Sequence, residues 1–268
     1  MQASGNDFVF LESSITSKTV ELIKKIGDRK FGVGFDQAFV VESHTATPSS
    51  AITKEFPNLT DFGYAKCTIY NQDGSEAGMC GNGIRCLAHY LLQLYGNTTH
   101  WVLETSVTHV VAQVVKVDDA LNVQVRVNMG IPKLPDQGKL IDITLSTPEI
   151  MSVYKEGVVQ GIRVDIGNPH FVTIVPNDFP LLAPETTNAF KATGSSLEEH
   201  ATFAPHKTNV EFIQLLSPSQ TAVRVWERGV GETMSCGSGA CASAVASLLL
   251  SKEPSVLVSL PGGDIQID

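Results

Sequence analysis

The sequence predicts an α+β fold of two pseudo-symmetric domains, each a mixed or antiparallel sheet wrapped around a central helix, with an active site in the interdomain cleft. The first observation behind this prediction is a Cys-Gly-x-Gly turn that occurs at residues 80–83 and again at 236–239. A glutamate precedes each leading cysteine by four residues. The second observation is that an apolar segment of helical length follows each turn, with several short strand-like segments around it.

Both segments that follow the turns are apolar around most of a helical circumference. The positions concerned are Ile84, Leu87, Ala88, Leu91 and Leu92 in the first, and Ala242, Val245, Ala246, Leu249 and Leu250 in the second. A helix without a polar face is expected to be buried, which requires a sheet around it.

The first half contains a helix with Thr16 as its cap and Gly27 as its end, and a Thr-, Ser- and Pro-rich loop at 44–60. We expect the other elements in this order: a loop and strand at 5–12, the helix at 16–27, strands at 35–42 and 67–71, a turn at 72–75, the helix at 82–95 and strands at 101–105 and 109–117. The Asp118-Asp119 pair marks a break in composition. We therefore expect domains at 1–118 and 119–268.

The second half repeats the pattern of strands around one apolar helix. Strands are expected at 122–128, 141–145, 158–166, 170–174, 208–215 and 221–226, with loop and helix at 178–191. The second apolar helix is expected at 238–250, followed by a hairpin over 256–267.

Composition and charge exclude several classes of protein. The 268 residues are 43% hydrophobic and 18% charged, with a net charge of −9. Nucleic-acid binding needs clustered Lys and Arg, and the sequence has no such cluster. The longest nearly apolar run, 240–250, is about half of the ~20 residues that a membrane helix needs. The N-terminus lacks the features of a secretory signal, so we expect a soluble, cytoplasmic protein.

Five cysteines are present, at positions 67, 80, 86, 236 and 241. An odd number without an export signal indicates free thiols. Their spacings do not match a zinc site, and no C-x-x-C redox motif is present, so no metal is expected. We interpret Cys67, Cys86 and Cys241 as structural thiols within a strand and two helices.

Cys80 and Cys236 differ from the other three because each immediately precedes a predicted helix. The unpaired N–H groups of a helix start attract an anion and can lower the pKa of a thiol. Two such thiols across one cleft suit the inversion of a carbon centre, because one can remove a proton while the other delivers one to the opposite face. The same N–H groups can hold a carboxylate.

Four stretches together resemble the signature of diaminopimelate epimerases. They are 71–85 (NQDGSEAGMCGNGIR), 5–8 (GNDF), 167–170 (GNPH) and 227–240 (ERGVGETMSCGSGA). The resemblance implies a cofactor-independent enzyme that interconverts LL- and meso-2,6-diaminopimelate in lysine and peptidoglycan precursor synthesis, with Cys80 and Cys236 as acid/base thiols. It also implies that Gly81, Asn82, Gly237 and Ser238 hold the reacting carboxylate, and that Asn6, Gln37, Asn71, Asn168, Asn209, Glu227 and Arg228 bind the rest of the substrate.

The residue chemistry agrees with these implied roles. Arg228 can pair with a distal carboxylate and Glu227 with an ammonium group, while asparagine amides offer donor and acceptor together. His170 is a candidate neighbour of a thiol. Family members usually begin with a strand before the GNDF loop and continue past the Gly-Gly-Asp segment, whereas this chain begins close to the loop and stops at Asp268.

Two other functions stay open at this point. A proline or hydroxyproline racemase would also use two thiols, but its substrate lacks the second carboxylate and ammonium that Arg228 and Glu227 would bind. A non-catalytic amino-acid-binding protein would not need cysteine at both helix starts. The sequence does not decide the oligomeric state, and a homodimer is one assembly compatible with it.

Overall fold

The computed structural model describes residues 1–12, 15–42, 47–57, 59, 62–118, 122–176, 178–183 and 186–268. These residues form two compact units, Met1–Met129 and Gly130–Asp268. The first unit extends past the expected boundary at 118/119 because the strand Val123–Val127 pairs with the strand before it. Residue 119 of the expected Asp118-Asp119 break lies outside the described residues.

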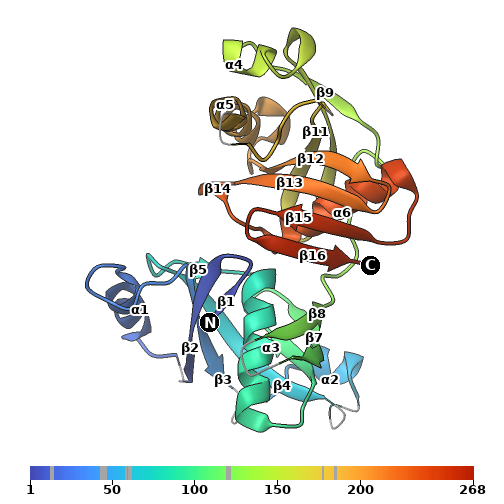
Figure 1. Cartoon of the computed structure of the whole chain (residues 1–268). Helices are drawn as coiled ribbons and strands as arrows, with labels where there is room; N and C mark the ends of the chain where they lie inside the picture. The colour runs from blue at the N-terminus through green and yellow to red at the C-terminus, as the bar shows by residue number, and fades with distance from the viewer. Residues whose placement is uncertain are drawn as a thin grey trace. The chain divides into compact units, whose positions relative to one another are not determined.

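The described residues of the first unit form one mixed sheet with α-helices packed against it (Figure 1). Its strands are β1 (Gln2–Ala3), β2 (Asn6–Glu12), β3 (Gln37–Glu42), β4 (Gly63–Asn71), β5 (Glu76–Ala77), β6 (His100–Glu104), β7 (His109–Val117) and β8 (Val123–Val127). The order is β1-β2-β3-β4-β6-β7-β8, with β5 paired to β4. Its helices are α1 (Thr19–Gly27), α2 (Ser50–Glu55) and α3 (Gly81–Tyr95).

Helix α3 lies in the hollow of this sheet, and its apolar side chains form the larger core of the unit. Ile84, Leu87 and Leu91 are fully buried and pack with Phe39, Ile69 and other strand side chains. A smaller cluster that includes Ile23 of α1 covers the opposite face. The expectation of a buried helix wrapped by its own sheet is thus confirmed for α3.

The second unit is also one mixed sheet (Figure 1). Its strands are β9 (Ile141–Thr144), β10 (Val158–Asp165), β11 (Pro169–Ile174), β12 (Asn209–Ser217), β13 (Gln220–Glu227), β14 (Gly231–Thr233), β15 (Val256–Leu260) and β16 (Gly263–Ile267). The order is β16-β15-β13-β12-β11-β10-β9, with β14 paired to β13. The helical segments are α4 (Pro148–Met151), η2 (Lys155–Gly157), α5 (Thr187–Glu198), η4 (Ala201–Phe203) and α6 (Gly237–Ser251).

Two cores cover the two faces of the second sheet. On one face, α6 packs its small side chains against Val172, Ile213 and Val225. On the other, Phe190 of α5 packs against Phe212. Because successive residues of a strand point to opposite faces, Phe212 and Ile213 serve different cores.

The two sheets share one connectivity. In the first, β2 and β3 are parallel, β3 and β4 antiparallel, and β4 and β6 parallel with α3 between them. In the second, β11 and β12 are parallel, β12 and β13 antiparallel, and β13 and β15 parallel with α6 between them. The short strands β5 and β14 pair in the same way with β4 and β13. The internal repeat predicted from the sequence therefore corresponds to two sheets with the same strand pairing and the same position of the apolar helix.

Two local predictions were wrong. The expected loop at 44–60 contains α2, although residues 44–46, 58 and 60 lie outside the described residues. Helix α1 begins at Thr19 with Lys18 as its N-cap, while the Thr16 hydroxyl accepts a hydrogen bond from the Lys18 N–H. In the described part of the chain, no helix combines the length and apolarity needed to cross a membrane.

Candidate active site

Cys80 forms the junction between β5 and α3. Its backbone is extended (φ −145°, ψ 104°), and its carbonyl accepts the first helical hydrogen bond from Ile84 N at 2.9 Å. The thiol is half-buried. An N-cap residue lies beside the unpaired N–H groups of the first turn, so Cys80 occupies the place that the sequence predicts for a reactive thiol.

A polar network fixes Asn82 and Asn6 near this helix start. Asn82 is buried; its Nδ2 donates to Asn6 Oδ1 at 2.8 Å, and its Oδ1 accepts from Arg85 Nη2 at 2.8 Å. Asn6 Nδ2 in turn donates to Asp36 Oδ2 at 3.1 Å. The two predicted substrate ligands are thus joined to each other.

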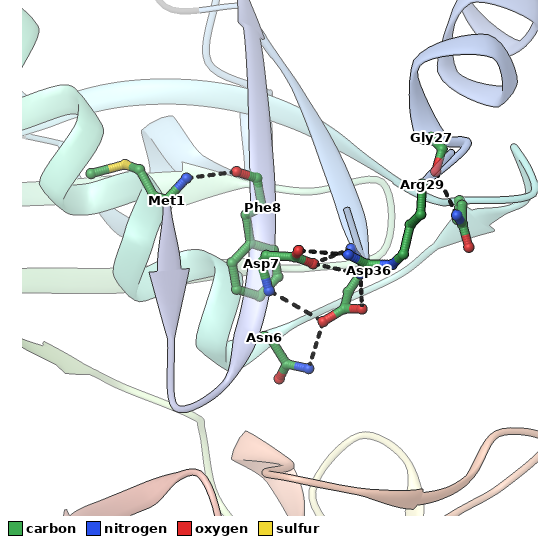
Figure 2. A network of polar contacts seen from close by, with 8 residues as sticks. Met1, Asn6, Asp7, Phe8, Gly27, Arg29 and Asp36 are labelled. Atoms are coloured by element: carbon green, nitrogen blue, oxygen red, sulfur yellow. Dashed lines mark hydrogen bonds and ion pairs between the residues drawn. The ribbon is translucent and has the colours of Figure 1, made fainter. Parts of the chain in front are cut away.

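Arg29 anchors the other end of this network, as Figure 2 shows. Its guanidinium donates two 2.8 Å hydrogen bonds to the Asp7 carboxylate and a third of 2.7 Å to Asp36 Oδ1. The hydrogen bond from Arg29 lowers the pKa of Asp7. Asp36, held by Arg29, in turn orients Asn6 through its Oδ2.

Gln37 and Asn71 lie opposite each other on β3 and β4. Gln37 Nε2 donates to Asn71 Oδ1 at 3.0 Å, and Asn71 Nδ2 donates to Ser75 Oγ at 3.0 Å. Gln37 Oε1 is buried and makes no hydrogen bond within the described residues. A buried amide oxygen without a donor is a candidate acceptor for a ligand N–H group.

Cys236 is the N-cap of α6 and is more enclosed than Cys80. Its Sγ accepts a hydrogen bond from Gly239 N at 3.3 Å and lies 3.5 Å from Ser238 Oγ. Burial, together with the negative charges of Glu227 and Glu211, raises the pKa of this thiol well above its ordinary value. The expected lowering is therefore wrong for Cys236: the hydrogen bonds at the helix start act in that direction but are outweighed. Cys236 is a protonated thiol at neutral pH.

A chain of polar contacts leads from this thiol into the sheet. Asn168 Nδ2 donates to Ser238 Oγ at 3.3 Å, and Asn168 Oδ1 lies 2.9 Å from His170 Nε2. His170 Nδ1 lies 2.7 Å from Glu211 Oε1. His170 is thus linked to Cys236 through two predicted substrate ligands.

The remaining predicted ligands of the second unit surround the end of β13. Thr233 Oγ1 donates to Glu227 Oε1 at 2.6 Å. Asn209 Oδ1 accepts from Arg228 N at 2.9 Å, and Arg228 Nη1 donates to the His206 carbonyl at 2.7 Å. The Thr233 contact holds the Glu227 side chain next to β14, which leads to Cys236, and the His206 carbonyl holds the Arg228 guanidinium next to the segment before β12.

Strand register gives the predicted ligands equivalent places in the two units. Phe8 aligns with Gln37 as His170 aligns with Asn209. Two residues before Phe8 and His170, the equivalent ligands are Asn6 and Asn168. The same alignment matches Gln37 with Asn209, the first residues of β3 and β12. It also matches Asn71 with Glu227, the last residues of the antiparallel neighbours β4 and β13.

The three other cysteines belong to the strand and helix bodies. Burial raises the pKa of Cys67 to about 12 and that of Cys86 to about 11. Cys241 lies within α6 and is half-buried. Burial in apolar surroundings keeps Cys67 and Cys86 protonated and unreactive.

The predicted residues therefore gather in two groups, one around each thiol. Cys80, Gly81, Asn82, Asn6, Gln37 and Asn71 belong to the first unit, and Cys236, Gly237, Ser238, Asn168, Asn209, Glu227 and Arg228 to the second. Sequence reasoning missed Glu211. Its signal was a lone carboxylate between apolar residues of a predicted strand, which is unusual for a buried segment.

The whole sequence was compared with known protein families. A family model described as diaminopimelate epimerase matches residues 1–135 and 162–268. The chain belongs to the diaminopimelate epimerase family. It is accordingly an isomerase of the epimerase class, with a small molecule as its substrate.

Curated members of the diaminopimelate epimerase family align over nearly the full chain. The protein named diaminopimelate epimerase from Acinetobacter baumannii (strain AYE) is 37% identical, over 100% of this chain and 88% of its own length. Its namesake from Microcystis aeruginosa (strain NIES-843 / IAM M-2473) is 37% identical over 99% of this chain and 88% of its own.

Solved structures confirm the predicted fold class. A probable proline racemase from Agrobacterium radiobacter K84 matches with a TM-score of 0.66 at 14% identity, over 99% of this chain and 82% of that one. A predicted epimerase from Pseudomonas aeruginosa matches with a TM-score of 0.62 at 11% identity, over 100% and 89% of the two chains. At these identities the likeness concerns the fold alone.

Proposed function

We propose that this chain interconverts LL- and meso-2,6-diaminopimelate by proton transfer between the substrate and the two thiols Cys80 and Cys236, without a cofactor. The observation that carries the proposal is a cysteine at the N-cap of each of two topologically equivalent helices. The relatives named diaminopimelate epimerase support the choice of substrate. The reaction belongs to lysine and peptidoglycan precursor synthesis.

The proposed chemistry assigns opposite protonation states to the two thiols. Cys80 as thiolate takes the α-proton, and the electron pair of the broken C–H bond stays on the α-carbon. Cys236 as thiol delivers a proton to the opposite face and becomes the thiolate. The raised pKa of Cys236 supports its role as the acid in this direction. In the reverse direction the two roles exchange.

Backbone N–H groups at the two helix starts hold the reacting carboxylate. These belong to Gly81 and Asn82 of α3 and to Gly237 and Ser238 of α6. A helix start carries partial positive charge, so it stabilises the negative charge that builds on the carboxylate as the α-proton leaves. Both starts are needed if the carboxylate is to stay fixed while the α-carbon inverts.

The other substrate ligands recognise the distal end and the amino groups. Arg228 pairs with the distal carboxylate and Glu227 with an ammonium group. The amides that complete the site are Asn6, Gln37, Asn71, Asn168 and Asn209. A proline-type substrate would leave Arg228 and Glu227 without partners, which disfavours that alternative.

Substitution of each thiol tests the two-base proposal. Cys80→Ala and Cys236→Ala are each expected to abolish epimerisation of LL-diaminopimelate while circular dichroism shows an intact fold. Cys67→Ala, which alters a thiol outside the site, is expected to keep activity if it folds. Epimerisation by the Cys80→Ala or the Cys236→Ala variant would contradict the two-base proposal.

Isotope labelling gives a second readout on the unmodified enzyme. In deuterated water the product epimer should gain deuterium at its α-carbon before the remaining substrate does, because different thiols take and deliver the proton. Equal early labelling of both epimers would indicate one shared base. The cytoplasmic location expected from the sequence stays a prediction, and a homodimer stays one assembly compatible with the sequence.

A further inference from the structure

His170 and Glu211 form a fully buried polar pair on the face of the second sheet that α6 covers. Both side chains have 0% exposure, and Nδ1 lies 2.7 Å from Oε1. In the parallel register of β11 and β12, Glu211 is opposite Val172, which shares a face with His170. Burying a carboxylate costs free energy unless a charged partner compensates it, so the pair requires an explanation.

The equivalent positions of the first unit show that packing alone does not require polar groups. Phe8 and Phe39 occupy them, with ring centroids 5.9 Å apart in an edge-to-face contact. A Cβ on Gly83 of α3 would collide with the Phe39 ring. In the second unit, a Cβ on Gly239 would lie 2.7 Å from Glu211 Oε1. An aromatic pair and a charged pair thus fill the same space beneath the two helix starts.

Each ring nitrogen of His170 faces an oxygen atom that can accept a hydrogen bond. Nδ1 faces the Glu211 carboxylate, and Nε2 faces Asn168 Oδ1 at 2.9 Å. Both partners are acceptors, so the ring satisfies them when both nitrogens carry hydrogen. The Glu211 carboxylate balances the resulting charge. Glu211 Oε2 is buried without a hydrogen bond in the described part of the chain, which leaves the ring as the partner of this carboxylate.

When both ring nitrogens carry hydrogen, the ring determines which way the Asn168 amide points. With Oδ1 held by Nε2–H, Asn168 Nδ2 is directed at Ser238 Oγ, 3.3 Å away, and Ser238 Oγ lies 3.5 Å from Cys236 Sγ. A neutral ring protonated only at Nδ1 would present a bare nitrogen to Asn168. The amide would then turn over and direct its oxygen at Ser238.

We propose that Glu211 is a positioning residue, which acts through His170 to fix the orientation of Asn168 and Ser238 beside Cys236. The inference rests on the proposed function, in which Asn168 and Ser238 contact the substrate. In the described part of the chain the Glu211 carboxylate makes its hydrogen bond to His170 and none to Cys236. It determines which atom of the Asn168 amide donates and which accepts a hydrogen bond near Cys236. Phe39, at the equivalent position of the first unit, cannot orient a polar side chain in this way.

Glu211→Gln is the first test, because it keeps the shape of the side chain and removes its charge. Nitrogen-15 NMR of histidine-labelled protein at neutral pH, with the signals assigned through His170→Gln, should show both His170 nitrogens protonated in the parent protein. In Glu211→Gln one nitrogen should lose its proton. The kcat/KM for diaminopimelate should fall about ten- to a hundredfold. This is the range typical of residues that orient a ligating side chain without contacting the bound molecule themselves.

A His170→Phe/Glu211→Phe double variant is the second test, since the first unit tolerates this pair in the same packing. Its circular dichroism should match the parent, and its kcat/KM should fall at least as far as that of Glu211→Gln. Thr173→Val is the matched control. Thr173 is fully buried on β11, and its Oγ1 donates to Gln160 O at 2.8 Å on the opposite face. It should keep the His170 signals and kcat/KM.

Three results would overturn the inference. The first is an unprotonated ring nitrogen on His170 in the parent protein, a measurement that needs no folded variant. The second is unchanged kcat/KM in folded Glu211→Gln or in the double variant. The third is an equal loss of kcat/KM in Thr173→Val. A parent enzyme that is inactive on diaminopimelate would reject the proposed function instead, while the His170 signals would still decide the state of the pair.

Discussion

Arg228 is the side chain on which the proposed recognition of the distal carboxylate depends. Its backbone N–H is held by Asn209 Oδ1, and one guanidinium nitrogen donates to the His206 carbonyl. A guanidinium has five N–H donors in a rigid fork, so this anchoring leaves a geometry suited to a carboxylate. The anchor reduces the entropy that Arg228 would lose when a substrate binds.

Arg228→Met is therefore expected to weaken substrate binding, because methionine keeps much of the length and removes the charge. A hydrogen bond to a charged group contributes about 1.5–3 kcal/mol, so KM for diaminopimelate should rise about ten- to a hundredfold. Steady-state kinetics measure this change. Arg163→Met is the control, since Arg163 pairs with Asp136 and is not a predicted substrate ligand. An unchanged KM in Arg228→Met would mean that the distal carboxylate binds elsewhere.

For single residues, the sequence predicted where the two cysteines lie better than it predicted the pKa of their thiols. The Cys-Gly-x-Gly turns correctly predicted that Cys80 and Cys236 would precede helices. The turn says nothing of the burial of Cys236 or of Glu227 and Glu211 near it, and these raise its pKa. Glu211 escaped prediction because its partner, His170, lies on a different strand far away in the sequence, and only the parallel register brings the two together.

Among the secondary-structure elements, the two helix starts depend on a close approach to the sheet beneath them. Gly83 lies in the first turn of α3, directly against the Phe39 ring, while Gly239 lies against Glu211. The glycines at these points allow the helix to approach within van der Waals contact of a strand. Each helix start, and with it the preceding cysteine, is thereby held at a fixed height above its sheet.

Gly83→Ala is expected to destabilise the protein by about 1–3 kcal/mol, the usual cost of overpacking a filled core. Urea denaturation measures the change. Phe39→Leu should relieve the crowding, so the double variant should lose less stability than the sum of the two single variants. Strictly additive losses would show that the alanine methyl group meets no resistance from Phe39.

Most of the longer strands and the two apolar helices could be predicted from periodicity, but α2 could not. Its sequence, Ser50–Glu55, follows a Pro- and Ser-rich stretch that resembles a loop. One buried side chain, Ile52, ties this helix to the unit. A six-residue helix with one buried side chain gives almost no periodic signal.

For the whole molecule, buried thiols link folding to pH. Cys67, Cys86 and Cys236 all have raised pKa values in the folded chain, about 12 and about 11 for the first two. An unfolded thiol titrates near ~8.5. Below that pH both states hold the proton and the contribution to stability is complete. Above it the unfolded state releases the proton first, so stability falls as pH rises towards the folded values.

The free energy of unfolding should therefore decline between about pH 8.5 and 10.5, by up to about 1.4 kcal/mol per pH unit for each such thiol. Cys67→Val should make this decline less steep, because it removes one titrating group and keeps an apolar side chain of similar size. Urea denaturation in the presence of a reductant measures both slopes. Parallel slopes for parent and variant would contradict the assignment.

The repeat predicted from the two cysteine turns extends to the whole chain, since the two sheets share strand order and parallel pairs. The position of the boundary was less accurate because β8 adds an edge strand to the first sheet after the break in composition. An edge strand with alternating exposed residues looks the same at the end of one domain as at the start of the next.

The continuity of each sheet along the chain has a consequence for synthesis of the protein. The first sheet takes its strands from residues 2–127 and the second from residues 141–267. Neither waits for a strand from the other end of the polypeptide, and domains of this kind fold as units, the N-terminal one first, while the ribosome is still translating. The group of polar residues around Cys80 can thus be complete before the codon for Cys236 is read.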